Sequence, residues 1–423
     1  MPIRVLIIGG TQFMGRHLTA KLLSDTDFSV CLLNRGRTKS PFKVDNERLF
    51  HFPCDRFAHH EFRKTLAQIG PCDFIVDFLC FQRSHAKDVV RSVWPIWNRQ
   101  GDGERTLPQK SLRLYIMIST DSIYMPCAPV SHRCGVKEID AVRPLTKADI
   151  LTVSNRDSYQ LQYGGNKLHT EQFLNQVWQQ TGFPFVALRL PDVIGPFDNL
   201  RGFLDLRQRL LKQKTIGLRI GACCDEKECG KKHRISLVFA PDVAKAILQI
   251  MMHELRVPKL QVQVAASERP TTSESPKRKK RSRDTKHESC IPVPEKEGTT
   301  AVAAAKVSQS VRGQAFNIAC KETPSFKSFV AQVARELNTS PTWSRQREAP
   351  MVSVDIGSLD ICSAETTFGF KPTPLSTVIS NTLEWFRERS NRKRTRKLDA
   401  SSSSESESDG NSSDSSWSSS ADE

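Results

Sequence analysis

Two side chains near the middle of the chain have the types and spacing that proton transfer requires. Tyr163 and Lys167 are four positions apart, so on a helix they share one face, where the ammonium favours the deprotonated phenol. A phenol with an ordinary pKa of about 10 could then act as an acid or base near neutral pH. An exposed helical pair without a chemical role has the same spacing, and that interpretation stays open at this point.

A cluster of hydroxyl groups follows an apolar run, in the order Tyr115-Ile-Met-Ile-Ser119-Thr120-Asp121-Ser122. The run predicts a buried strand near 113–119. Ligands of open parallel sheets bind beyond the carboxyl ends of the strands, so the hydroxyls of Ser119 and Thr120 are predicted to face a binding site. The alternative is an ordinary turn that ends a strand.

The chain begins with a pattern typical of a dinucleotide site. An apolar run predicts a buried parallel strand, and it leads through a glycine turn into a helix, in the order Gly9-Gly10-Thr11-Gln12-Phe13-Met14-Gly15. The first two glycines allow a tight turn, the last allows the helix to pack closely on the strand, and the helix N-terminus offers N–H groups to a pyrophosphate. Gln12 stands where a glycine is expected, and its side chain would either crowd the phosphates or hydrogen-bond to them.

The elements that must position these motifs indicate an α/β fold, a doubly wound parallel sheet of the Rossmann kind. Apolar segments predict strands near 3–8, 28–33, 73–78, 113–119, 184–190 and 235–239, and helices at 14–24, 83–98, 159–180 and 242–252. We expect a dinucleotide-binding domain at 1–266 with a substrate-side segment at about 196–234, a disordered basic insertion at 267–310, a smaller C-terminal substrate subdomain at 311–389, and a disordered basic, then serine-rich and acidic tail at 390–423.

Charge is distributed unevenly along a chain whose formal net charge is +16. Basic runs at 277–283 and 391–397 predict recognition by a nuclear import receptor, with RNA as the alternative partner. The acidic, serine-rich tail predicts phosphorylation by an acid-directed kinase. Neither a membrane span nor a secretion signal is expected from the sequence. The scattered cysteines suit reduced thiols, so the predicted location is the nucleus, the cytoplasm or both.

Taken in chain order, four motifs resemble those of one known family. The glycine turn, the run from Ser119 to Tyr124, the segment Tyr163-Gly-Gly-Asn-Lys167 and the stretch from Leu188 to Pro196 are together similar to the extended short-chain dehydrogenase/reductase family, of the NAD-dependent epimerase/dehydratase type. This resemblance implies an epimerase, dehydratase or oxidoreductase acting on a sugar-like or nucleotide-linked small-molecule substrate. The glycine turn also resembles the branch that includes chloroplast stem-loop RNA-binding proteins, which implies the alternative of a catalytically silent RNA-binding or dinucleotide-sensing protein on the same fold.

The resemblance also assigns roles to individual residues. Tyr163 would exchange a proton with the substrate, Lys167 would hold the nicotinamide ribose and lower the pKa of the tyrosine, and Thr120 would orient the substrate oxygen, with Ser119 beside it. Asp55 falls at the family position near the adenine. The segment between the hydroxyl cluster and Tyr163 is longer than usual for the family, so it could reshape the substrate mouth.

The residues after the second predicted strand bear on the choice of cofactor. An acidic residue there would hydrogen-bond to the adenosine ribose and select NAD, but this chain has Asn34, Arg35 and Arg37. Two guanidinium groups and no carboxylate suit a 2′-phosphate. NADP is therefore predicted in preference to NAD.

Three thiols and an imidazole at short spacing raise the question of a zinc site, at Cys223, Cys224, Cys229 and His233. The adjacent cysteines and the lack of a paired Cys-x-x-Cys argue against it, and no metal is predicted. Arg234 lies where related enzymes often place a cation on a substrate phosphate. The oligomeric state stays open, with a homodimer as one option.

Overall fold

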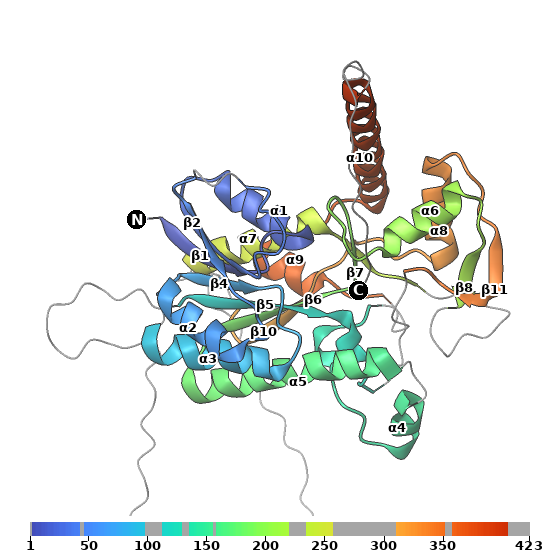
Figure 1. Cartoon of the computed structure of the whole chain (residues 1–423). Coiled ribbons are helices and arrows are strands. Elements are labelled where there is room, and N and C mark those ends of the chain that lie inside the picture. Colours follow the sequence, from blue (N-terminus) through green and yellow to red (C-terminus); the bar gives the residue numbers. More distant parts are fainter. Residues whose placement is uncertain are drawn as a thin grey trace, which may run out of the picture.

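The computed structural model describes residues 2–42, 46–97, 112–128, 135–154, 158–219, 234–256, 310–351 and 358–404. Its main sheet has seven strands, all parallel (Figure 1). In spatial order they are β10 (Gln314–Asn317), β6 (Phe185–Leu190), β5 (Leu114–Thr120), β4 (Phe74–Asp77), β1 (Ile3–Ile8), β2 (Phe28–Asn34) and β3 (Leu49–Pro53). The order reverses between β1 and β4, which creates a crevice at their carboxyl ends where such sheets bind ligands.

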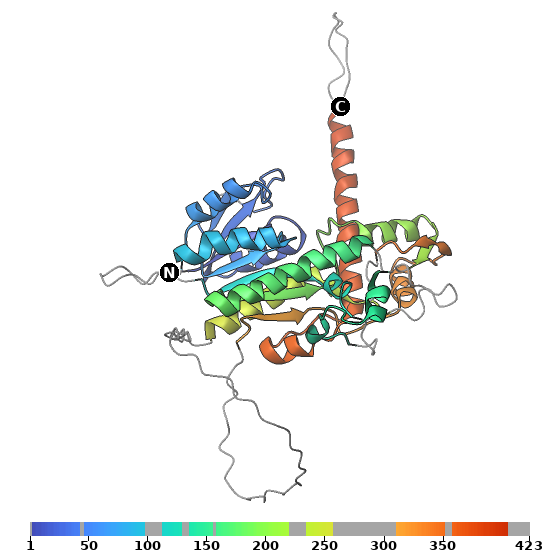
Figure 2. The same cartoon turned by 90° about the horizontal axis from the view of Figure 1, so that it is seen from below.

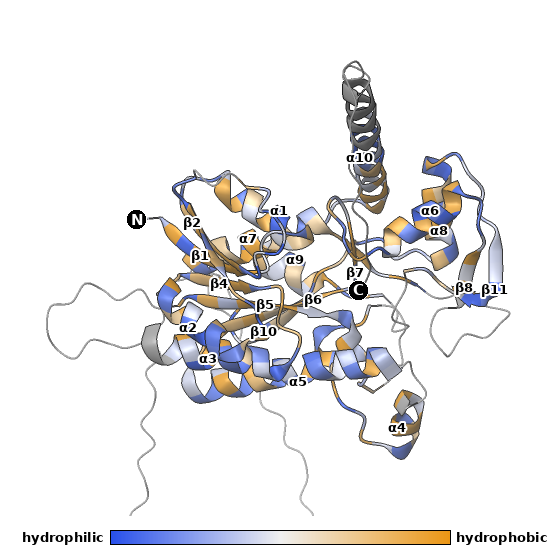
Figure 3. Cartoon of the chain, viewed as in Figure 1, coloured by the Kyte–Doolittle hydropathy of each residue, from blue (hydrophilic) through white to orange (hydrophobic). Residues whose placement is uncertain are grey.

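Helices cover both faces of this sheet, so the main body has three layers (Figures 1 and 2). One face carries α1 (Phe13–Leu23), α7 (Ala240–Arg256) and α9 (Cys362–Phe368), and the other carries α2 (His59–Ile69), α3 (Arg83–Trp97) and α5 (Ser158–Thr181). The inner strands are buried on both sides, which is why their sequences are continuously apolar. Figure 3 shows the hydrophobic sheet between helices with polar outer faces. The predicted fold class is confirmed.

A smaller body has its own apolar core. It consists of α6 (Gly202–Leu211), β8 (Ile216–Arg219), α8 (Phe326–Glu336), β11 (Trp343–Glu348) and the first turns of α10 (Leu375–Ser404). Phe203 packs against both Phe329 and Phe386 at its centre. Since α6 and β8 precede residue 266 whereas β10 belongs to the main sheet, the two bodies are interleaved along the chain.

Short elements complete the described chain. The strands β7 (Asp192–Ile194) and β9 (Leu237–Phe239) pair with each other rather than with the main sheet, where the strand predicted at 235–239 was expected. The long segment before Tyr163 holds the single-turn helices η1 (Asp121–Tyr124) and η2 (Glu138–Asp140) and the helix α4 (Lys147–Ser154). Within the described ranges, no helix is both long and apolar enough to cross a membrane.

Helix α10 differs from the expectation for the start of the tail. It continues to Ser404, past residue 390 where the disordered tail was predicted to begin, and projects away from both bodies (Figures 1 and 2). Residues 375–404 include neither glycine nor proline, and Arg392 pairs with Glu388 one turn earlier at 3.2 Å. Residues 390–404, predicted to be disordered, are therefore helical. Residues 405–423, and all but Ser310 of the predicted insertion at 267–310, lie outside the described ranges.

Candidate active site

A cavity of about 710 Å³ opens at the carboxyl ends of β1, β2, β4 and β5, which is the crevice that the strand order creates. This volume falls within the range of small-molecule sites. Most of the predicted site residues line it: Gly9, Thr11, Gln12, Phe13, Met14, Gly15, Asn34, Arg35, Arg37, Asp55, Ser119, Thr120, Tyr163 and Lys167. Two do not. Gly10 packs inward, since a Cβ there would lie 2.4 Å from the Leu32 side chain, and Arg234 donates to the carbonyl of Thr323.

The glycine turn has the geometry that a pyrophosphate cradle needs. Gly9 has a φ of +94°, and a Cβ on Gly15 would lie only 2.1 Å from the Gly9 carbonyl oxygen. The N-cap residue of α1, Gln12, makes no side-chain cap bond, and the first turn carries no acidic residue. The helix therefore presents backbone N–H groups and its positive dipole end to the cavity. The residues present fit a dinucleotide.

The end of β2 offers donors to the ribose side of such a ligand. The side-chain Oδ1 atom of Asn34 accepts hydrogen bonds from the Gly36 amide and the His51 ring at 2.9 and 3.1 Å. Its amide nitrogen is buried and has no partner among the described residues. Arg35 and Arg37 are exposed at the rim of the cavity. This edge is therefore rich in hydrogen-bond donors, as the sequence predicts.

Thr120, Tyr163 and Lys167 meet at the opposite end of the cavity. The Thr120 hydroxyl acts on the pKa of the Tyr163 phenol, and its hydrogen bonds at 3.2 and 3.4 Å go to the Ser122 hydroxyl and the Asp121 carboxylate. Lys167 is buried, donates to the Ile118 carbonyl at 2.7 Å, and lies 5.9 Å from the centre of the Tyr163 ring. Gly164 makes the approach possible, because a Cβ there would lie 1.8 Å from the Ser122 carbonyl oxygen. The structure thus brings the three residues together from β5 and α5.

The electrostatics of the phenol differ from the sequence prediction. Burial, followed by the nearby Asp121 carboxylate and the Tyr159 phenol, raises the pKa of Tyr163 to about 12, while the Thr120 hydroxyl acts in the opposite direction. Burial also lowers the pKa of Lys167. The predicted lowering of the tyrosine pKa by Lys167 is absent, since the ammonium donates to the Ile118 carbonyl rather than to the phenol.

Two carboxyl groups at this end were not predicted as site residues. Asp121 is 6% exposed, and Asp192 follows β6 at the start of β7; both line the cavity. Burial raises the pKa of Asp121 well above its ordinary value, and the charge of Asp192 adds to this. The sequence signal was available, because Asp121 follows a predicted strand at its carboxyl end, where ligands of parallel sheets bind.

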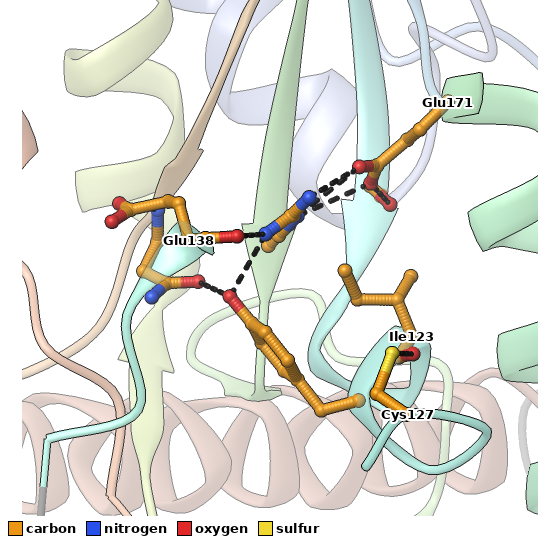
Figure 4. Close-up of polar contacts among 8 residues, drawn as sticks. Ile123, Cys127, Glu138 and Glu171 are labelled. Carbon is orange, nitrogen blue, oxygen red and sulfur yellow. Dashed lines mark hydrogen bonds and ion pairs between the residues drawn. The ribbon is translucent and has the colours of Figure 1, made fainter. Parts of the chain in front are cut away.

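Ser119 has a structural role in addition to its place at the cavity wall. Its hydroxyl donates to Glu171 of α5, and Glu171 also pairs with Arg189 of β6 at 2.7 Å. Arg189 donates on to the Tyr124 hydroxyl and to the Glu138 carbonyl (Figure 4). This buried network ties α5 and η1 to the sheet, so the Ser119 hydroxyl is held by Glu171 rather than left for a substrate.

The predicted thiol and imidazole cluster cannot be placed. Cys223, Cys224, Cys229 and His233 lie outside the described residues. Among the residues that are described, no group of three or more His, Cys, Asp and Glu side chains could hold a metal ion.

Comparison with known proteins gives one family. The sequence model of the NAD dependent epimerase/dehydratase family matches residues 5–265, which is more than half of the chain. This range includes the glycine turn, the hydroxyl cluster and the Tyr163 to Lys167 segment. No curated protein sequence matches the chain.

Solved structures of similar fold include sugar-nucleotide enzymes. UDP-glucuronic acid 4-epimerase from Bacillus cereus, in complex with UDP-glucuronic acid and NAD, has a TM-score of 0.57 at 15% identity and covers 91% of this chain and 99% of its own. dTDP-glucose 4,6-dehydratase from Bacillus anthracis, in complex with NAD, has a TM-score of 0.56 at 11% identity, covering 91% and 97%. UDP-glucose 4-epimerase from Thermotoga maritima, with UDP-glucose, has a TM-score of 0.55 at 14% identity, covering 92% and 99%. At these identities the likeness shows the fold.

Proposed function

The chain belongs to the NAD dependent epimerase/dehydratase family, and we propose that it is an active enzyme that transfers a hydride and a proton on a sugar-like or nucleotide-linked substrate. The observation that carries this proposal is the meeting of Thr120, Tyr163 and Lys167 at one end of a cavity whose other end is a glycine cradle. A purely structural arrangement would not need a buried lysine and a half-buried phenol at the wall of an open cavity.

The chain's own residues divide the chemistry between them. Tyr163 takes the proton from a substrate hydroxyl, and Thr120, which lines the same end of the cavity, orients the same substrate oxygen. Lys167 is placed to hold a ribose hydroxyl while its ammonium stays fixed on the Ile118 carbonyl. The dinucleotide, when bound, supplies the hydride acceptor.

Asp121 extends this proposal towards dehydration. Its raised pKa keeps the carboxyl protonated to higher pH than an ordinary aspartic acid, so it can donate a proton. Loss of a substrate hydroxyl as water requires such a donor beside the reacting carbon. A carboxyl acid beside the Tyr163 base therefore favours dehydration, the reaction of the dTDP-glucose 4,6-dehydratase from Bacillus anthracis.

The preferred cofactor in this proposal is NADP, with NAD as the alternative. Arg35 and Arg37 at the rim, with the Asn34 side-chain nitrogen that has no partner within the described ranges, supply donors where NAD selection would need an acceptor. Each guanidinium group can donate two parallel hydrogen bonds to one phosphate.

A second candidate function, RNA binding without turnover, has one observation in its favour. Beside the cavity mouth the Phe197 ring lies under the Arg16 guanidinium at 3.7 Å and packs against Trp385, whose ring has Arg389 at 5.2 Å. Alternating arginine and aromatic side chains suit stacked bases and phosphates. Nuclear import, tail phosphorylation and homodimer formation stay predictions from the sequence.

One experiment separates the two functions. Full-length protein is purified natively, its bound small molecule is identified by mass spectrometry, and it is assayed with UDP-glucose, UDP-glucuronic acid and dTDP-glucose. We expect bound NADP or NAD, and a loss of activity of about 100-fold or more in Tyr163→Phe, against a small loss in Tyr159→Phe on the same helix. Absence of a dinucleotide, together with salt-dependent RNA affinity that Tyr163→Phe leaves unchanged, would contradict the enzyme and favour RNA binding.

A further inference from the structure

Gln12 bridges two loops that stand on opposite sides of the cavity mouth. Its amide nitrogen donates to the Thr38 hydroxyl, beyond the end of β2, at 2.9 Å. Its amide oxygen accepts from the Asn199 amide, beyond β7, at 2.8 Å. All three side chains are exposed and all three line the cavity. The Gln12 amide therefore does not occupy the glycine cradle. Both of its polar atoms are hydrogen-bonded to residues of the two loops.

The loop that carries Asn199, residues 196–201, is itself fixed to the helix of the cradle. The His17 ring hydrogen-bonds to the Pro196 carbonyl at 3.0 Å, and the Phe197 ring lies under Arg16. Phe197 and Arg201 have φ values of +66° and +68°, a conformation that non-glycine residues adopt only when their surroundings hold them. This loop is therefore held in a defined conformation against α1.

The start of α1 has also adapted to the glutamine. Gln12 is extended, with φ −126° and ψ 154°, and the next residue, Phe13, has a positive φ of +39° in addition to that of Gly9. Phe13 is 4% exposed, so burial of its ring holds this unfavourable backbone in place. The side chain of Gln12 is thus directed outward to the two loops by a strained but well-packed turn.

We infer that Gln12 is a clasp which closes the dinucleotide cleft, so that Thr38 or Asn199 must release it before a dinucleotide enters or leaves. This inference rests on the proposed function. The clasp spans the cradle and not the reaction end, where Thr120 and Tyr163 lie. It therefore governs how fast the cofactor exchanges and not how fast hydride moves.

The size of the effect follows from the two hydrogen bonds. Each exposed bond between neutral side chains contributes a modest factor to the barrier, and both end on the same amide. Removing the amide should speed dinucleotide release about tenfold, and removing either outer partner should speed it about threefold. Because both bonds end on the Gln12 amide, the two loop variants together should match Gln12→Ala, and neither should add to the effect of Gln12→Ala.

The test is the dissociation rate of bound NADPH, and of NADH in parallel, from the full-length protein, followed by stopped-flow fluorescence during displacement by excess oxidised dinucleotide. Variants are Gln12→Ala, Thr38→Val, Asn199→Ala and the double variant Thr38→Val with Asn199→Ala. Gln208→Ala, an exposed glutamine on α6 away from the cavity, is the matched control. Thermal unfolding checks that each variant is folded.

We expect faster release in Gln12→Ala, a similar rate in the double variant, intermediate rates in the single loop variants, and no change in Gln208→Ala. Unchanged release in Gln12→Ala, or tighter binding without faster release, would overturn the clasp while leaving the proposed function intact. If the wild-type protein binds neither dinucleotide, both the clasp and the proposed function fail.

Discussion

The two ends of the cavity are built in different ways. At the dinucleotide end, the contacts come from backbone and from exposed side chains of consecutive residues, with Gly9 and Gly15 in the cradle and Arg35 and Arg37 at the rim. At the reaction end, buried side chains from distant elements meet, as Thr120 of β5 and Lys167 of α5 do. The first end needs local backbone geometry, whereas the second needs the packing of the whole main body. Changes at the two ends should therefore separate binding from chemistry.

The largest effect is expected from a methyl group at the reaction end. In Gly164→Ala the new Cβ would lie 1.8 Å from the Ser122 carbonyl oxygen, so α5 must move away from η1. That movement separates Tyr163 from Thr120, and a misplacement of about 1 Å can lower a rate by about 100-fold. We expect turnover to fall by that factor or more and dinucleotide affinity to fall much less, since only Lys167 of α5 contacts the dinucleotide in the proposed function, measured by steady-state kinetics and dinucleotide titration.

Two other glycines act as comparisons for this variant. Gly165 has nothing within 4 Å of its would-be Cβ, so Gly165→Ala should keep its activity and gain about 1 kcal/mol in the free energy of unfolding from helix propensity. Gly15→Ala should instead lower dinucleotide affinity, because its methyl group would lie 2.1 Å from the Gly9 carbonyl oxygen. If Gly164→Ala lost affinity as strongly as turnover, the division between the two ends would be wrong.

A smaller effect is expected at the rim of the dinucleotide end. Arg35→Ala and Arg37→Ala should each weaken NADP binding about tenfold, since a charge-assisted hydrogen bond is lost, and should leave NAD binding unchanged. The measurement is the ratio of the two dissociation constants by calorimetry. Arg335→Ala, an exposed arginine on α8, removes the same charge far from the cavity and should keep the ratio. Equal loss for NAD and NADP would mean that these arginines give general attraction and no selectivity.

The same contrast explains which features the sequence could predict. The glycine turn is contiguous, so its residue types alone indicated a strand, a turn and a helix, and the structure has them at 3–8 and 13–23. The elements missed were those with weak apolar patterns, such as β3, an edge strand whose residues are largely exposed or half-buried. Element pairing was also beyond the sequence, because the place of β10 beside β6 depends on a contact between residues far apart in the chain.

The reaction end was predictable in its residue types and not in its electrostatics. The spacing of Tyr163 and Lys167 places them on one face of α5, as observed. However, the hydrogen bond from Lys167 to Ile118 and the burial of Asp121 arise from the packing of α5 and η1 on β5, which no local pattern encodes. The direction of a pKa shift depends on such neighbours, so the sequence predicted it wrongly for Tyr163.

The smallest expected effect tests this electrostatic difference directly, through Asp121→Asn. Burial is the largest cause of the raised pKa of Tyr163 and the Asp121 carboxylate is the second, so removing the carboxylate should lower the pKa from about 12. Hydride transfer in the oxidising direction uses the phenolate, and below the pKa its fraction rises about tenfold for each unit that the pKa falls. The single-turnover rate of dinucleotide reduction at pH 9 should therefore rise in Asp121→Asn, and the midpoint of its pH profile should move to lower pH. Asp192→Asn is the control, because Asp192 acts on Asp121 and not on the phenol, and should move the midpoint less. If the midpoint stays fixed in Asp121→Asn, the charge of Asp121 does not raise the pKa of Tyr163. The raised pKa would then come from the packing around the phenol and not from charge.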